Sequence, residues 1–191
     1  MKLDCPDIPL DIYLTDIVSD GGTRRSAEEA AVARLVAEAF GAGARRSHRS
    51  DGSPYILQGD GSEADEGVSI SHSRGMAALA IIPAGTEAGI DIEDERPQLV
   101  RVIPRICSPA ECDAYAGGDG LLRAWTMKEA LYKAARHRLG KEIDFTAQIH
   151  LPAAGSDIAA VSSADGQQTR SYRVYHHRVA PGTLLTAVVS V

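Results

Sequence analysis

The chain has 191 residues, of which 44% are hydrophobic and 24% are charged. This composition excludes a disordered segment, a collagen-like chain and a disulfide-stapled miniprotein, and the length predicts one domain or two small halves with an apolar core. The net charge of −6, from 20 basic and 26 acidic residues, argues against a general nucleic-acid binder, which needs a basic surface.

The apolar stretches and the cysteines predict a cytoplasmic protein without a membrane span. The longest apolar stretches, residues 76–84 and 184–189, are shorter than the roughly 20 residues that cross a bilayer. The N-terminal sequence MKLDCPDIPLD carries acids and prolines where a signal peptide carries an apolar run. Cys5, Cys107 and Cys112 lack the spacing and partners of a zinc site, so we expect reduced thiols in packing positions.

The spacing of apolar residues predicts strands and helices that alternate along the chain. In chain order we expect a strand at 9–18, a helix at 26–40, a solvated turn at 58–67, strands at 68–73, 76–82 and 89–93, short helices at 97–106 and 109–115, a long helix at 121–138, and strands at 145–151, 172–177 and 184–191. Ser26 is the expected N-cap of the first helix, with Glu29 completing a capping box. The chain is therefore expected to contain both helices and strands.

Basic residues gather in two clusters on this acidic chain. The clusters are Arg24, Arg25, Arg45, Arg46 and Arg49, and then Arg123, Lys128, Lys133, Arg136, Arg138 and Lys141. Two basic patches indicate an anionic ligand of limited size, although a solvated helix face is the better explanation for any single arginine. The first patch adjoins a helix N-terminus, which can hold a phosphate.

Three carboxylates are candidates for chemistry. Asp91 and Glu93 are two residues apart on a short strand, so their side chains point to one face and repel each other unless a cation lies between them. Glu129 shares a helix face with Lys133. Oxygen ligands select a hard ion such as Mg²⁺, which usually shares its site with phosphate oxygens. The alternatives are a solvent-facing edge strand and a surface ion pair.

The segment around His72 is a second candidate. Ser71 and His72 are neighbours on a strand and point to opposite faces, so they do not form a nucleophile–base pair. The sequence contains no nucleophile elbow. A histidine flanked by hydroxyls suits anion binding, and a histidine bonded to the backbone at a hairpin end is an equally good explanation.

Three motifs together resemble a known family. Residues 89–93 (GIDIE) and 125–133 (WTMKEALYK), with residues 70–73 (ISHS) upstream, resemble the signature segments of 4′-phosphopantetheinyl transferases of the surfactin-synthetase-activating type. Residues 107–111 (CSPAE) lie where the family has a Phe-Ser-x-x-Glu stretch. The resemblance covers about residues 20–150, and its motifs occur in the order and spacing of the family.

The resemblance implies an enzyme that transfers 4′-phosphopantetheine from coenzyme A to a serine of an apo acyl or peptidyl carrier protein, as in secondary metabolite biosynthesis, and releases 3′,5′-ADP. It implies that Asp91, Glu93 and Glu129 bind Mg²⁺, with Mn²⁺ as a possible substitute. Glu129 or a metal-held water would take the serine proton, and Lys133 would neutralise or protonate the leaving phosphate. Coenzyme A would contact Arg25, Ser26, Arg49, Ser71, His72 (at its 3′-phosphate), Asp91, Lys128 and Lys133.

The resemblance also implies an architecture. We expect an α/β (α+β) pseudo-dimer within one chain, with halves 1–95 and 96–191 that divide near residues 93–97. The ligand would bind in the cleft between the halves, and the protein would be a monomer. Arg101, Arg105 or Arg123 would face an acidic helix of the carrier protein.

One departure from the family leaves an alternative open. Residues 52–54 (GSP) lie where the family usually has Gly-Lys/Arg-Pro, so a phosphate-binding cation is missing unless Arg45, Arg46 or Arg49 replaces it. The alternative from another class is a non-catalytic module that binds coenzyme A or a carrier protein. A magnesium-dependent nucleotide hydrolase is a weaker third reading, because the sequence has no Nudix-type box.

Overall fold

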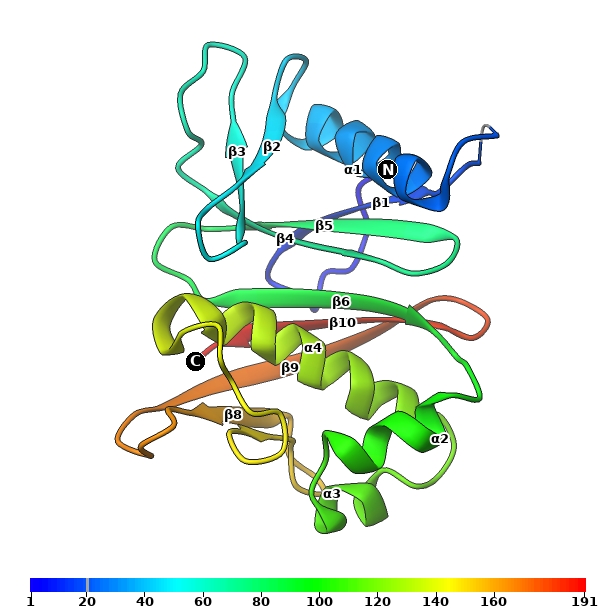
Figure 1. Cartoon of the computed structure of the whole chain (residues 1–191), viewed down its shortest axis with the longest axis vertical. Helices are drawn as coiled ribbons and strands as arrows, with labels where there is room; N and C mark the ends of the chain where they lie inside the picture. The colour runs from blue at the N-terminus through cyan, green and yellow to red at the C-terminus, as the bar shows by residue number, and fades with distance from the viewer. Residues whose placement is uncertain (20) are drawn as a thin grey trace. The chain divides into compact units, whose positions relative to one another are not determined.

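A computed structural model describes residues 1–19 and 21–191, and the chain divides into two units, Met1–Thr86 and Glu87–Val191 (Figure 1). The first unit contains β1 (Asp11–Asp16), α1 (Arg24–Phe40), β2 (Arg45–His48), β3 (Pro54–Leu57), β4 (Gly67–His72) and β5 (Met76–Ile82). Its main sheet has the antiparallel order β1-β5-β4, and β2 and β3 form a separate hairpin. The mostly small and aliphatic residues of the central strand β5 are largely buried, and helix α1 contacts this strand.

Helix α1 covers the first sheet with an apolar stripe. The buried positions of this stripe are Ala27, Ala31, Val32, Leu35 and Val36. The helix begins at Arg24 with Thr23 as N-cap, whose hydroxyl accepts a hydrogen bond from the Ser26 amide at 3.1 Å. The predicted N-cap at Ser26 is therefore wrong. Glu29 forms an ion pair with Arg25 at 2.9 Å instead of closing a capping box.

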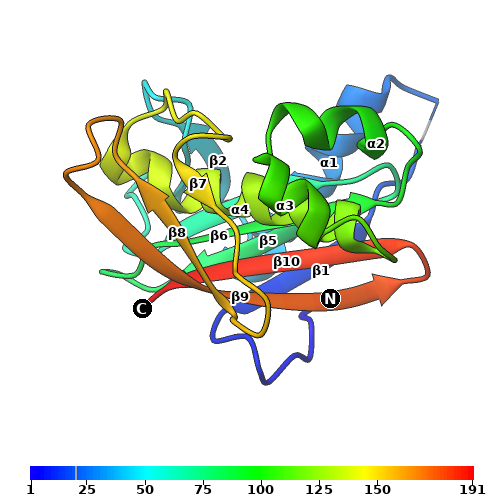
Figure 2. The same ribbon diagram turned by 90° about the horizontal axis from the view of Figure 1, so that it is seen from below.

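The second unit is built on a five-stranded antiparallel sheet of order β6-β10-β9-β8-β7. Its elements are β6 (Ala88–Asp94), α2 (Leu99–Val102), the 3₁₀ helix η1 (Ile103–Arg105), α3 (Pro109–Ala114), α4 (Gly120–Leu139), β7 (Ile149–His150), β8 (Ile158–Ser162), β9 (Thr169–Ala180) and β10 (Thr183–Ser190). Helix α4 lies along this sheet, and Figure 2 shows the same elements from below. Met127 and Leu131 of α4 pack with Tyr172 and Val174 of β9 in one buried cluster.

The structure corrects several predicted boundaries. Of the strand expected at 145–151, only Ile149–His150 is a strand, because residues 145–148 form a turn whose amides bond to Asp144. Strands β2, β3 and β8 were not predicted, since four or five residues give too short a pattern. The expected break near 93–97 also differs from the observed division after Thr86, because β6 pairs with β10 inside the second unit.

Gly89 allows β6 to approach α4 closely. A Cβ atom at this position would lie 2.2 Å from the carbonyl oxygen of Ala130 and 2.9 Å from the amide nitrogen of Ala134. Both distances are too short for any side chain, so a residue other than glycine would push the strand from the helix. The glycine of the GIDIE segment thus sets the distance between the acidic strand and the helix that carries Glu129.

A short polar row crosses the sheet of the second unit beneath α4. The hydroxyls of Thr126 (α4) and Thr186 (β10) are 2.6 Å apart, and Nδ1 of His176 (β9) lies 2.9 Å from the Thr186 hydroxyl. Both threonines are fully buried. The row links the helix to two strands within the core of the second unit.

The burial of His176 predicts a pH-dependent stability. Burial and the nearby Arg123 lower the pKa of His176 to about 4. In the unfolded chain the imidazole of His176 binds a proton near pH 6.5, whereas in the folded protein it does so only near pH 4. The free energy of unfolding therefore keeps its full value above pH 6.5 and falls as the pH drops toward 4, by about 3 kcal/mol at most. Urea unfolding at pH 7.5 and pH 5 should show this loss, and His176→Gln should reduce it. An equal pH dependence in both proteins would contradict the assignment.

No helix among residues 1–19 and 21–191 combines the length and apolarity that a bilayer crossing requires.

Candidate functional site

Three side chains of α4 form a stripe on the face that packs on β6. Trp125, Glu129 and Lys133 are four residues apart, which places them above one another on one side of a helix. Nε1 of Trp125 donates a hydrogen bond to Oε1 of Glu93 at 3.1 Å, and Nζ of Lys133 donates to Oδ1 of Asp91 at 2.9 Å. Because the ends of the stripe contact the two acidic residues of the strand, Glu129 lies between these contacts.

The electrostatics of the second unit agree with this placement. Burial, together with the charges of Asp91 and Glu93, raises the pKa of Glu129 to about 7 against the opposing effect of Lys133. Burial and the charge of Asp91 also raise the pKa of Glu93. The charge of Asp91 therefore acts on both glutamates, and the three carboxylates share one region of the second unit. We call Asp91, Glu93 and Glu129 the acidic cluster.

Two cations of the same unit balance part of this charge. The ammonium group of Lys133 also donates to the carbonyl oxygen of Ile90 at 3.1 Å, which fixes its position on the strand. The guanidinium of Arg96 donates from Nη2 to Oε1 of Glu93 at 3.0 Å. Sequence reasoning did not find Arg96, and its spacing of three residues from Glu93 is the only signal in the sequence.

The acidic cluster fits a hard divalent cation in its chemistry. The described part of the chain contains no group of three or more His, Cys, Asp or Glu side chains arranged to hold a metal ion. In this structure Asp91 contacts Lys133, and Glu93 contacts Trp125 and Arg96. The donor set nevertheless suits Mg²⁺, since its ligands are carboxylates whose mutual repulsion a cation relieves.

Lys128 occupies a different place from the one predicted. It is fully buried, and Nζ donates to both carboxylate oxygens of Glu111 and to the carbonyl oxygens of Phe145 and Ile149 at 2.6 to 3.2 Å. Burial raises the pKa of Glu111, but the amides of Leu151 and Ser108 and the Lys128 ammonium together hold it below its usual value. Lys128 therefore links α4 to α3 and to the segment that follows α4. Its ammonium group is buried in these contacts and is not available to a phosphate in this structure.

The first unit contains a cavity lined by both basic and acidic side chains. The cavity has a volume of about 350 Å³ and is lined by Arg25, Glu28, Glu29, Val32, Arg46, His48 and His72. Arg46 and His48 are two residues apart on β2, so both point to the side of that strand that faces the cavity. Nδ1 of His72 lies 3.7 Å from Oε1 of Glu28. The cavity brings together two residues expected to bind coenzyme A, Arg25 and His72.

The other predicted residues of the first unit lie elsewhere. Arg49 pairs with Glu63 and stacks on the ring of Tyr55 at 4.8 Å, so it is not part of the cavity lining. Ser26 is exposed, and its hydroxyl donates to the carbonyl oxygen of Thr23 at 2.7 Å. Ser71 is buried on β4. Among the three arginines considered as replacements for the missing cation, the structure places only Arg46 in the cavity.

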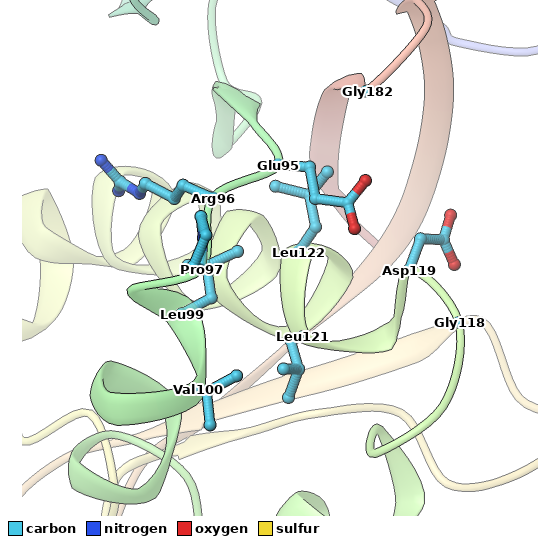
Figure 3. A pocket seen from close by; sticks show the side chains of 10 residues that line it. All are labelled: Glu95, Arg96, Pro97, Leu99, Val100, Gly118, Asp119, Leu121, Leu122 and Gly182. Atoms are coloured by element: carbon cyan, nitrogen blue, oxygen red, sulfur yellow. The ribbon is translucent and has the colours of Figure 1, made fainter.

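A larger cavity in the second unit adjoins Arg96. It has a volume of about 490 Å³, and its lining residues are Glu95, Arg96, Pro97, Leu99, Val100, Gly118, Asp119, Leu121, Leu122 and Gly182. Figure 3 shows the carboxylates of Glu95 and Asp119 on one side and the guanidinium of Arg96 turned the other way. The lining of the cavity therefore combines aliphatic side chains with charged groups.

The comparison with known families covers the second unit. A model of the 4′-phosphopantetheinyl transferase superfamily matches residues 87–189, which is more than half of the chain and includes the acidic cluster and Lys133. No curated protein matches the chain. The matched region contains the strand, the helix and the close approach between them that are described above. The chain therefore belongs to the 4′-phosphopantetheinyl transferase superfamily.

Proposed function

We propose that the protein is a magnesium-dependent 4′-phosphopantetheinyl transferase of the surfactin-synthetase-activating type. It transfers phosphopantetheine from coenzyme A to a serine of an apo acyl or peptidyl carrier protein and releases 3′,5′-ADP. The single observation that carries the proposal is the stripe Trp125, Glu129 and Lys133, whose ends contact Glu93 and Asp91. Superfamily membership supports the reaction class.

The residues of the second unit suit the steps of this transfer. Asp91, Glu93 and Glu129 would hold Mg²⁺, which when bound neutralises charge on the pyrophosphate. The serine oxygen forms a bond to the phosphorus that carries pantetheine, and the bond from that phosphorus to the 3′,5′-ADP oxygen breaks. Glu129 accepts the serine proton. Lys133 neutralises the charge that develops on the departing phosphate.

The cavity of the first unit is a candidate for a phosphate of the nucleotide. Beside the carboxylates of Glu28 and Glu29, its lining includes two guanidinium groups and two imidazoles, whose N–H groups can donate hydrogen bonds to a phosphate. The partly buried Arg46 would supply the cation that Ser53 does not. Ser53 itself is buried, and its hydroxyl donates to Asp51 at 2.6 Å, so it has no direct role in this proposal.

Arg46→Ala is therefore expected to raise the KM for coenzyme A about tenfold with little change in kcat. The reason is that Arg46 would bond to the phosphate equally in the bound substrate and in the transition state. Arg49→Ala is the matched control, since Arg49 pairs with Glu63 outside the cavity. Steady-state kinetics with varied coenzyme A measures both. A larger effect in the Arg49 variant than in the Arg46 variant would contradict the assignment.

The carrier protein is expected to contact the surface formed by α2 and η1. Val100 is 63% exposed there, and Arg101 and Arg105 are exposed as well. Arg123 is a weaker candidate, because its Nε donates to Asp119 at 2.9 Å. An apolar residue flanked by cations suits an acidic amphipathic helix.

The pseudo-dimer of two similar halves, the monomeric state and the cytoplasmic location remain predictions.

A transfer assay tests the function. The protein is incubated with coenzyme A, Mg²⁺ and apo carriers from fatty-acid, polyketide and peptide-synthetase systems, and each carrier is weighed by intact mass spectrometry. We expect at least one carrier to gain the mass of one phosphopantetheinyl group. Tight binding of coenzyme A without any mass gain would instead indicate the non-catalytic module, and release of nucleotide products without a carrier would indicate a hydrolase.

A further inference from the structure

The carboxylate of Glu93 is held by two donors that both reach the same oxygen. Nε1 of Trp125 lies 3.1 Å from Oε1 and Nη2 of Arg96 lies 3.0 Å from it. Neither of these bonds uses Oε2. The side chain of Glu93 is 18% exposed, so water competes only partly for these contacts. The orientation of this carboxylate is therefore set by the indole and the guanidinium.

The two donors also support each other. The guanidinium of Arg96 lies over the indole ring of Trp125, with its central carbon 5.6 Å from the ring centre. The indole packs at the edge of the buried cluster that contains Leu99, Leu122 and Leu184. Because a cation over an aromatic face is attracted to it, a fixed indole also limits the movement of the guanidinium. The contacts of Trp125 thus link the apolar core to the acidic cluster.

We propose that Arg96 and Trp125 are positioning residues that hold Oε1 of Glu93 so that Oε2 is directed to the divalent cation. This inference rests on the proposed function, in which Glu93 is a ligand of Mg²⁺. The pair touches neither substrate nor metal in this account. Its effect passes through Glu93, and partners of this kind typically contribute 10–100-fold to metal affinity or activity.

The electrostatics separate this role from a simple charge effect. The positive charge of Arg96 lies near Glu93 and Glu129 and would by itself repel a metal ion. If Arg96 acted only through its charge, weakening its contact with Glu93 would make metal binding tighter. A positioning role predicts weaker binding when either donor is altered, including the uncharged indole.

Two variants and one control test the proposal in the full-length protein. Trp125→Phe keeps an aromatic ring and removes the N–H donor, and Arg96→Lys keeps the charge but loses the planar group that stacks on the indole. Arg170→Lys is the control, because Arg170 is an exposed arginine of β9 in the same unit and has no role in the proposed site. Mn²⁺ affinity without coenzyme A is measured by electron paramagnetic resonance, and the transfer rate is measured as a function of Mg²⁺ concentration.

We expect each variant to weaken Mn²⁺ binding about tenfold and the control to bind as wild type. The double variant should lose less than the product of the single effects, because both donors act on one oxygen. Excess Mg²⁺ should restore most of the transfer rate, which it would not do for a general loss of structure. If Trp125→Phe strongly lowers the melting temperature, the Mn²⁺ affinity of Arg96→Lys alone tests the positioning role.

Two outcomes would overturn the inference in different ways. Wild-type Mn²⁺ affinity in both variants, with Mn²⁺ binding in the parent protein, contradicts the positioning role and leaves the proposed function in place. No Mn²⁺ binding and no transfer by the parent protein contradicts the proposed function and the positioning role together.

Discussion

Replacing Glu129 by glutamine is expected to lower the rate of phosphopantetheine transfer at least about a thousandfold. The substitution removes one of three carboxylates from the acidic cluster and also removes the group proposed to accept the serine proton. A positioned general base contributes about 10²–10⁴-fold, and loss of a metal ligand adds to this effect. Single-turnover transfer to an apo carrier measures the rate.

The fold of the Glu129→Gln variant should survive. The amide is almost the same size as the carboxylate and carries no charge, so it removes the burial of a charge and the repulsion from Asp91 and Glu93, which together raise the pKa of Glu129. The matched control is Glu142→Gln, an exposed glutamate beyond the end of α4 that should transfer at the wild-type rate. A Glu129→Gln enzyme with more than a tenth of the wild-type rate would refute the proposed role.

Replacing Lys128 by methionine is expected to destabilise the second unit by about 3–5 kcal/mol, which is the usual cost of breaking a buried ion pair from one side. The substitution leaves the Glu111 carboxylate, which is 14% exposed, without its ammonium partner. It also removes the donor to the carbonyl oxygens of Phe145 and Ile149. Urea unfolding followed by far-UV circular dichroism measures the loss.

A second substitution shows whether Lys128→Met destabilises the protein through the broken ion pair or through a change in packing. Lys128→Met combined with Glu111→Gln removes the isolated negative charge and should recover part of the lost stability. Lys141→Met is the control, because Lys141 is exposed just after α4. If Lys128→Met is as stable as this control, the network of Lys128 is not a structural tie, and a phosphate-binding role for Lys128 would have to be considered again.

The site was predictable where local periodicity decides which side chains share a face. The alternation of residues 89–93 predicted that Asp91 and Glu93 point the same way, and helical spacing predicted that Glu129 and Lys133 do so. The long helix was also predicted, and it begins at Gly120 and ends at Leu139. Superfamily membership could be expected from the same motifs.

The remainder depended on contacts between distant segments. Lys128 looked like an available cation, but its burial is decided by Glu111 and by two carbonyl groups from the segment after α4. Arg46, Arg45 and Arg49 could not be ranked before the hairpin of β2 and β3 placed Arg46 in a cavity. The hydrogen bond from Trp125 to Glu93 joins residues 32 positions apart, and no local pattern encodes it.

The central claim is that Asp91, Glu93 and Glu129 act together on one divalent cation bound with coenzyme A. The most direct measurement is a crystal structure of the protein with Mn²⁺ and coenzyme A, in which anomalous scattering locates the metal. We expect one Mn²⁺ ion with oxygen ligands from these three residues and from the pyrophosphate of coenzyme A. Coenzyme A bound with its pyrophosphate away from the three carboxylates, or Mn²⁺ at another place in the chain, would contradict it.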